Sequence, residues 1–158
     1  MLPTALWANT DGPCAGEAYR AFDFWLGEWR VTVPTGQLAG HNSITVSQQG
    51  CLLEERWQGV QGASGQSYNY YDTTTEKWSQ LWVSPGVVID ISGGLEGSVM
   101  VLKGQISYQQ NETTLDFIGR WTPNEDGTVT QEFEQWNPET ETWDNWFTGI
   151  YTKTDPDG

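Results

Sequence analysis

Glu55 and Arg120 are the two residues of this sequence whose chemistry and setting best suit acid–base work in an enclosed site. Each lies in a stretch in which apolar and polar residues alternate. A buried carboxylate needs a partner or a proton, because burial penalises its charge. We therefore expect Glu55 to pair with Arg120. In an enzyme, Glu55 would be the general acid or base and Arg120 would stabilise developing negative charge.

The strand faces that we predict to point inward carry tryptophan and amide side chains beside Glu55. Side chains alternate along a strand, which places Glu55 on the same face as Trp57 and places Gln80 between Trp78 and Trp82. Aromatic walls with a few placed polar groups are typical of small-molecule sites. The predicted ligand-binding residues are Glu55, Trp57, Trp78, Gln80, Trp82 and Arg120. The alternative is that Glu55 belongs to a satisfied core network, or faces solvent, and has no ligand role.

Metal and cofactor chemistry has little support in the sequence. His41 is the one histidine, and we expect it at the surface, whereas a zinc site needs three or four ligands at suitable spacing. We therefore predict no metal and no cofactor. Cys14 and Cys51 lie far apart, without a CxxC motif. They fit a disulfide in an exported protein, and the alternative is two free thiols in a cytosolic one.

The charge of the chain limits its partners. The formal net charge is −14, with only 7 lysines and arginines and no basic cluster. Binding to nucleic acid or to an anionic membrane surface is therefore disfavoured. No apolar stretch approaches the roughly 20 residues that span a bilayer as a helix. We expect a small apolar or aromatic molecule as partner, and neither nucleic acid nor membrane.

The beginning of the chain has no basic segment followed by an apolar run, so no signal peptide is visible. We expect an exported or periplasmic protein if the sequence lacks its signal peptide, and a cytoplasmic one otherwise.

Short strands separated by turn residues must position all of these side chains. The pattern predicts about ten strands, over 25–34, 40–48, 51–60, 66–71, 77–84, 87–92, 98–108, 113–122, 128–137 and 142–153. Short connections force antiparallel pairing, and closure hides the sheet edges. We therefore predict an all-β fold, a single antiparallel up-and-down barrel, with a two-sheet sandwich as the alternative. Residues 1–17 would form an irregular arm, 18–153 the barrel domain and 154–158 a polar tail.

The run Phe22–Trp29 resembles the opening of a family of small, mostly uncharacterised bacterial proteins, often with export signals. Further matching segments are Gly50-Cys51 with Glu55 and Trp57, Tyr71-Asp72, Trp78-x-Gln80-x-Trp82, Met100–Leu102, Trp121–Pro123 and Gly149-x-Tyr151. The resemblance implies a lipocalin-like (calycin) barrel. It also supports the disulfide, because in that family a cysteine ahead of the first strand commonly accompanies the Gly-Cys pair. Gly27-x-Trp29 is similar to the first-strand signature of nitrobindin-type barrels as well, but this chain lacks their haem-binding histidine near its end.

Three functions remain open from the sequence. The first is a barrel that binds an apolar or aromatic ligand in a tryptophan-lined cavity. The second is a cofactor-free isomerase, cyclase or lyase that acts in the same cavity. The third is a carbohydrate- or protein-binding module that uses exposed tryptophans.

Overall fold

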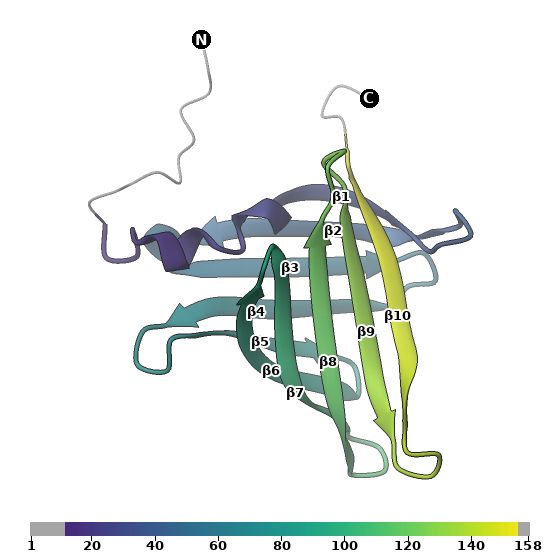
Figure 1. The fold of residues 1–158 in the computed structure, drawn as a ribbon. Helices are drawn as coiled ribbons and strands as arrows, with labels where there is room; N and C mark the ends of the chain where they lie inside the picture. The colour runs from purple at the N-terminus through teal and green to yellow at the C-terminus, as the bar shows by residue number, and fades with distance from the viewer. Residues whose placement is uncertain (1–11, 155–158) are drawn as a thin grey trace.

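Ten strands follow one another along the chain and close into one antiparallel barrel, as the sequence predicted (Figure 1). The structure is a computed structural model, and it describes residues 12–154. The strands are β1 (Gly27–Thr32), β2 (Leu38–Ser47), β3 (Leu52–Gly59), β4 (Ser64–Asp72), β5 (Lys77–Ser84), β6 (Val87–Glu96), β7 (Val99–Tyr108), β8 (Thr113–Pro123), β9 (Val129–Asn137) and β10 (Thr142–Lys153).

Each strand pairs with the next, because the connections are short turns. The first and last strands close the barrel, with register pairs that run from Trp29 with Lys153 to Thr32 with Ile150. Closure gives every described strand two partners, so none of them forms an open sheet edge. In Figure 1 the last strands, β8 to β10 (green to yellow), run across the direction of the earlier strands behind them.

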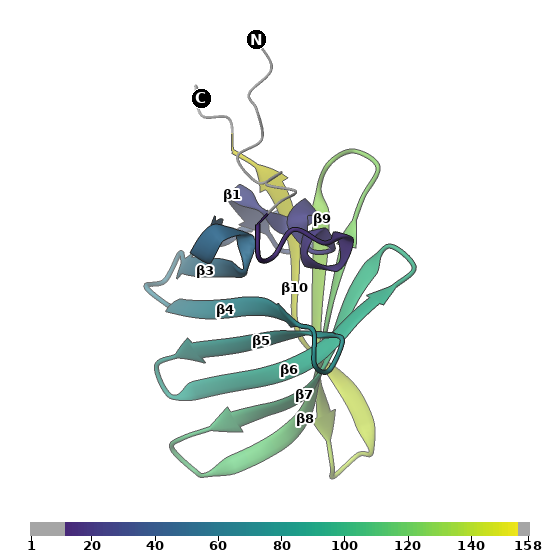
Figure 2. The same cartoon turned by 90° about the vertical axis from the view of Figure 1, so that its left-hand side faces the viewer.

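Short 3-10 helices precede the first strand: η1 (Glu17–Arg20) and η2 (Asp23–Trp25). The sequence placed Trp25 at the start of a strand, but it belongs to η2, and β1 begins at Gly27. The indole nitrogen of Trp29 donates a hydrogen bond of 2.8 Å to the Trp25 carbonyl oxygen, which fixes the entry into β1. Figure 2 shows this N-terminal segment (purple) lying across one side of the barrel.

A cluster of aromatic rings fills the barrel next to η2. The ring centroids of Phe22 lie 4.9 Å from Trp25 and 5.2 Å from Trp121, and all three side chains are fully buried. Offset and edge-to-face contacts of this kind add to the stabilisation that burial itself supplies. Buried aromatic side chains therefore fill this end of the barrel, which we call the closed end.

A disulfide joins Cys14 to Cys51, across a sequence separation of 37 residues. This confirms the predicted pairing. It ties the segment before η1 to the end of the 3-10 helix η3 (Gln48–Gly50), which follows β2. Arg20 reinforces the link, because its Nη2 donates a hydrogen bond of 2.6 Å to the Gly50 carbonyl oxygen. Of the predicted arm and tail, residues 1–11 and 155–158 lie outside the described residues.

Two glycines let β6 and β7 approach one another closely. A Cβ at Gly93 would lie 2.1 Å from the Val101 carbonyl oxygen, and one at Gly104 would lie 2.1 Å from that of Asp90. Any other residue at these positions would push the strands apart.

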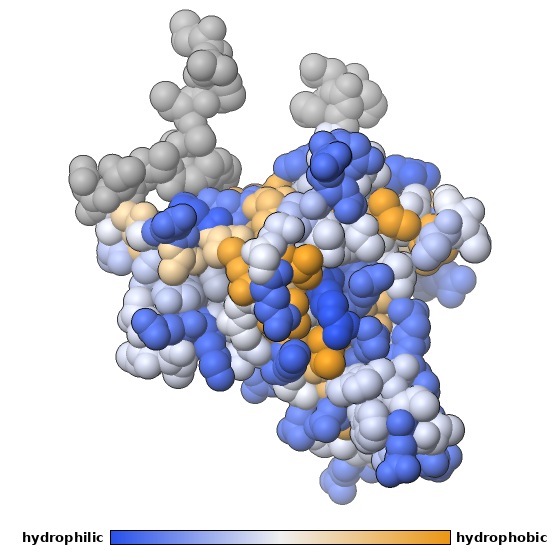
Figure 3. Space-filling model, viewed as in Figure 1, coloured by the Kyte–Doolittle hydropathy of each residue, from blue (hydrophilic) through white to orange (hydrophobic). Residues whose placement is uncertain are grey.

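The outer surface is largely hydrophilic on the face shown in Figure 3, with a small group of apolar side chains near its centre. In residues 12–154, no helix is long and apolar enough to cross a membrane.

Candidate functional site

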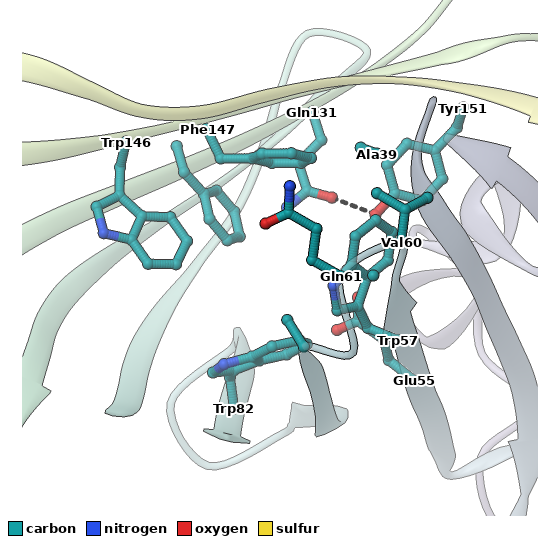
Figure 4. Close-up of a pocket in the computed structure, with 13 residues that line it drawn as sticks. Ala39, Glu55, Trp57, Val60, Gln61, Trp82, Gln131, Trp146, Phe147 and Tyr151 are labelled. Atoms are coloured by element: carbon teal, nitrogen blue, oxygen red, sulfur yellow. Dashed lines mark hydrogen bonds between the residues drawn. The ribbon is translucent and has the colours of Figure 1, made fainter. Parts of the chain in front are cut away.

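A pocket of about 360 Å³ lies inside the barrel, away from the closed end (Figure 4). We call it the barrel pocket. Its lining comes from strands β2, β3, β5, β9 and β10 and from the turn between β3 and β4. The lining residues are Ala39, Glu55, Trp57, Gly59, Val60, Gln61, Ala63, Trp82, Gln131, Phe133, Trp146, Phe147 and Tyr151. Val60, in the turn, is 56% exposed, so the pocket opens to solvent beside that turn.

Aromatic rings form most of the pocket wall. Trp57 and Phe147 meet edge to face, with centroids 6.2 Å apart. Phe133 and Trp146 lie 6.1 Å apart in a tilted arrangement. Figure 4 shows Trp82 across the pocket from Trp146 and Phe147. The pocket therefore presents ring surfaces from several sides to anything that enters it.

A β-bulge explains why two consecutive residues, Trp146 and Phe147, both line the pocket. The pairing of β10 with β9 shifts register between Asn145 and Phe147. A bulge sets two residues of one strand against one of its partner and re-aims a side chain. Simple alternation would send one of these two rings outward. The bulge instead adds a second ring to the wall.

Gly65 determines where the Trp82 ring can lie. A Cβ at Gly65 would be 2.0 Å from Cζ2 of that indole, so only glycine leaves room for the ring. The close approach seats Trp82 directly against β4, which contains Gly65.

Glu55 forms the polar floor of the barrel pocket and is 4% exposed. Its two carboxyl oxygens have different hydrogen-bond donors on the flanking strands. Asn42 Nδ2 of β2 donates to Oε2 at 2.7 Å, and Ser67 Oγ of β4 donates to Oε1 at 2.6 Å. Both donors are neutral, so the carboxyl group is buried and hydrogen-bonded without a cation.

The network continues in both directions from Glu55. On one side, Asn69 Nδ2 donates to Ser67 Oγ at 2.8 Å, and Gln80 Nε2 donates to Asn69 Oδ1 at 2.8 Å. On the other side, Asn42 Nδ2 also donates to the Tyr151 hydroxyl oxygen at 2.8 Å. That hydroxyl in turn donates to Gln131 Oε1 at 2.6 Å, the dashed line in Figure 4. Each polar group thereby holds its neighbour in place.

Burial sets the protonation of this network. It raises the pKa of Glu55 from 4.5 to about 7, although the hydrogen bonds from Asn42 and Ser67 pull it down. Burial, together with the nearby charge of Glu55, raises the pKa of the Tyr151 hydroxyl well above its usual value. Near neutral pH the carboxyl group therefore exists in both forms, whereas the phenol keeps its proton and remains a donor.

The predicted pair of Glu55 with Arg120 is wrong. Arg120 Nη1 forms a 2.6 Å ion pair with Glu134 Oε1, and both side chains are about a third exposed, at 33% and 31%. Alternation along β8 explains this, because Phe117 and Trp121 are buried in the barrel and Arg120, one residue before Trp121, points outward. Arg120 therefore takes no part in the barrel pocket.

The other predicted site residues divide between two parts of the interior. Glu55, Trp57 and Trp82 line the pocket. Gln80 is buried in the network behind Glu55. Trp78 lies at the closed end, where its indole nitrogen donates to the Ala18 carbonyl oxygen at 3.0 Å.

Sequence reasoning missed several pocket residues. Gln131 and Phe133 of β9 are buried and line the pocket, but neither was among the predicted site residues. Asn42 and Tyr151 meet across a sequence separation of 109 residues, a pairing that alternation within one strand cannot reveal.

Two further tryptophans, Trp136 and Trp143, lie apart from the barrel pocket. They face one another across the pairing of β9 with β10, and their rings pack edge to face at 5.4 Å. Trp143 is 39% exposed and Trp136 is half-buried, so this pair bears on the third function, a module that binds through exposed tryptophans.

No protein-family model matches the chain, and no curated protein matches it. The family resemblance of the run Phe22–Trp29 therefore stays a prediction, whereas the closed antiparallel barrel that it implied is confirmed. Within residues 12–154, no group of three or more histidine, cysteine, aspartate or glutamate side chains is placed to hold a metal ion.

Proposed function

We propose that the protein binds a small, largely apolar or aromatic molecule in the barrel pocket. The proposal rests on the pocket itself. Its walls are aromatic, and its floor is a buried, hydrogen-bonded carboxyl group. Aromatic walls provide affinity, and a few fixed polar groups orient the ligand. The ring system of the ligand would lie between Trp57, Trp82 and Phe147, with its polar group toward Glu55.

The size and rigidity of the pocket favour a compact ligand. Its volume of about 360 Å³ is at the lower end of the range of small-molecule sites, roughly 300–1,000 Å³. The disulfide, the packed closed end and the network behind Glu55 hold the walls in place before a ligand arrives. A preformed site loses less conformational entropy on binding.

A thermal-shift and fluorescence screen tests the proposal, with a panel of one- and two-ring compounds. We expect members of the panel to raise the melting temperature and to change tryptophan emission. Trp82→Ala should remove the effect. Trp143→Ala is the control, because Trp143 pairs with Trp136 and does not line the pocket. A panel without any effect, or equal loss in both variants, would refute pocket binding.

A cofactor-free isomerase or lyase is the second candidate, and the carboxyl group at the pocket floor favours it. With a pKa of about 7, Glu55 can both accept and donate a proton near neutral pH. Arg120 lies on the outside and cannot assist, and the Tyr151 hydroxyl already donates to Gln131 Oε1, so the neighbouring donor would be the amide nitrogen of Gln131. Glu55→Gln separates the candidates: an enzyme loses turnover by orders of magnitude, whereas a binding protein changes only in affinity.

The carbohydrate- or protein-binding module has weaker support. The rings of Trp136 and Trp143 are inclined at 64°, so they do not form the flat platform on which a sugar ring stacks.

We also propose that the protein works in an oxidising compartment outside the cytoplasm, because structural disulfides persist there. Thiol labelling of protein isolated from its native source without reductant tests this. A fully labelled Cys14 and Cys51 would contradict it.

A further inference from the structure

We propose that the ligand of the barrel pocket is an organic cation, an amine with an apolar or aromatic body whose ammonium group lies against Glu55. This inference rests on the proposed binding function and specifies the chemical class of the ligand.

The first argument is the missing counter-charge of Glu55. Its hydrogen-bond donors, Asn42 and Ser67, are neutral. Among the residues that line the pocket, only Glu55 and Tyr151 have ionisable side chains, and none of the lining residues is cationic. Buried charges in proteins are almost always paired. A cationic ligand would supply the partner that the protein does not.

The second argument is the unused acceptor capacity of the Glu55 carboxylate. An ionised carboxylate offers about four lone-pair sites. Asn42 and Ser67 occupy one on each oxygen. The remaining capacity can accept hydrogen bonds from an ammonium group, which carries donors only. Hydrogen bonds of this charged kind are the stronger ones.

The third argument is the aromatic wall. Trp57, Trp82 and Trp146 contribute indole rings, and Phe133, Phe147 and Tyr151 contribute further rings. The face of an aromatic ring attracts a cation, and indole does so most strongly. Rings arranged around a carboxylate therefore favour a positively charged guest over a neutral one of the same shape.

The same features select against anions. A carboxylate or phosphate ligand would meet the carboxyl group of Glu55 with no lining cation to offset the repulsion. The net charge of −14 adds a long-range field that attracts cations and repels anions.

The protonation of Glu55 should couple to binding. The groups facing it are Asn42 of β2, Ser67 of β4 and, through Asn42, Tyr151 of β10. Of these, only Tyr151 can ionise, and it stays protonated. The charged neighbours along β3, Glu54 and Arg56, lie on the opposite, outer face, and His41 of β2 is exposed as well. An ammonium group favours the ionised carboxylate, so affinity should rise as pH increases through about 7.

Matched ligand pairs test the proposal by isothermal titration calorimetry. Each pair keeps the ring system and exchanges an ammonium group for a hydroxyl: 2-phenylethylamine with 2-phenylethanol, and tryptamine with tryptophol. We expect the amine to bind about tenfold more tightly, or better, at about pH 8. The preference should shrink several-fold at about pH 6, where Glu55 is mostly protonated.

Glu55→Gln and Glu54→Gln are the paired variants. Glu54 is the preceding residue of the same strand and lies on the opposite face. Glu55→Gln should remove the preference for the amine and keep the affinity for the alcohol, whereas Glu54→Gln should retain the preference.

The outcomes separate the inference from the proposed function. If the alcohols bind as tightly as the amines, the organic-cation inference is wrong and the proposed binding function stands. A preference that survives Glu55→Gln also overturns the inference, because the carboxylate would not be its source. If neither member of any pair binds, both proposals fail.

Discussion

Asn42 joins the two ionisable groups of the barrel pocket through a single nitrogen atom: its Nδ2 lies 2.7 Å from Glu55 Oε2 and 2.8 Å from the Tyr151 hydroxyl oxygen. The early strands β2 and β3 thereby meet the last strand in the barrel interior. The closure of β1 against β10 brings these residues together, and 109 positions separate Asn42 from Tyr151 in the sequence.

Replacing Asn42 should therefore destabilise the folded protein. Asn42→Ala leaves Glu55 Oε2 and the Tyr151 hydroxyl oxygen without this donor in a buried site. We expect a loss of about 1–3 kcal/mol in the free energy of unfolding. It should also raise the pKa of Glu55 further, because the Asn42 hydrogen bond lowers it. Urea unfolding measures the loss, and Asn145→Ala, at an exposed position, is the control. Equal stability of the two variants would contradict the role of the network.

The stability of the protein should depend on pH through Glu55. Its pKa is raised in the folded state, from 4.5 to about 7, so the folded protein binds the proton more tightly. This contribution to stability is fully present below about pH 4.5 and is lost as the pH rises through about 7. The shift corresponds to about 3 kcal/mol.

Glu55→Gln isolates this effect. The glutamine side chain can accept from Asn42 with its carbonyl oxygen and donate to Ser67, so the variant should fold. The difference in unfolding free energy between wild type and variant should move in favour of the variant as the pH rises from about 4.5 to about 7. The other carboxyl groups are present in both proteins, so their pH-dependent contributions to the unfolding free energy cancel in the difference. A difference that does not change with pH would show that Glu55 titrates normally.

Gly65 should control the shape of the pocket. Gly65→Ala places a methyl group where the Trp82 indole lies, so the ring must shift. We expect a changed near-UV circular dichroism spectrum and at least a tenfold loss of ligand affinity, on the order of 1.4 kcal/mol. Gly94→Ala is the matched control, since a Cβ there meets nothing within 4 Å. Unchanged binding in Gly65→Ala would mean that Trp82 is not part of the binding wall.

The disulfide should stabilise the protein by restricting the unfolded chain. For a separation of 37 residues, the loop-entropy relation gives roughly 3–4 kcal/mol. The double variant Cys14→Ser/Cys51→Ser should lose about that much in urea unfolding, and reductant should affect only the wild type. A stability equal to wild type would show that the link adds nothing to the hydrogen bond of Arg20 with Gly50.

Arg120 should matter little, in contrast to its predicted role. Its ion pair with Glu134 is partly exposed, and such pairs contribute about 0–1 kcal/mol. Arg120→Ala should leave ligand binding unchanged and lower stability by less than about 1 kcal/mol. Loss of binding in this variant would contradict the placement of Arg120 outside the barrel.

Alternation and turn residues were sufficient to predict the fold from the sequence. The strand over 77–84 has the predicted bounds, and Trp78 and Gln80 are buried on the predicted inner face. The prediction succeeds because successive side chains of an antiparallel strand point alternately to the core and to solvent, so the pattern of apolar and polar residues repeats every two residues. The pattern misplaced Trp25, because this buried residue belongs to the 3-10 helix η2, in which side chains do not alternate between two faces.

The lining of the barrel pocket was only partly predictable. Glu55, Trp57 and Trp82 could be found, because each depends on its own strand. The partner of Glu55 could not be found, because opposite charge suggested Arg120, whereas the structure places that residue outside in an ion pair with Glu134. Trp146 required knowledge of the bulge, which depends on how β10 pairs with β9.

Nuclear magnetic resonance of the indole N–H groups is the most direct test of pocket binding. Each tryptophan contributes one signal, assigned by single Trp→Phe variants, and 2-phenylethylamine and 2-phenylethanol are titrated in turn. Pocket binding predicts that the signals of Trp57, Trp82 and Trp146 shift, whereas those of Trp25 and Trp78 at the closed end stay in place. Shifts confined to Trp136 and Trp143, or no shift with either compound, would contradict it.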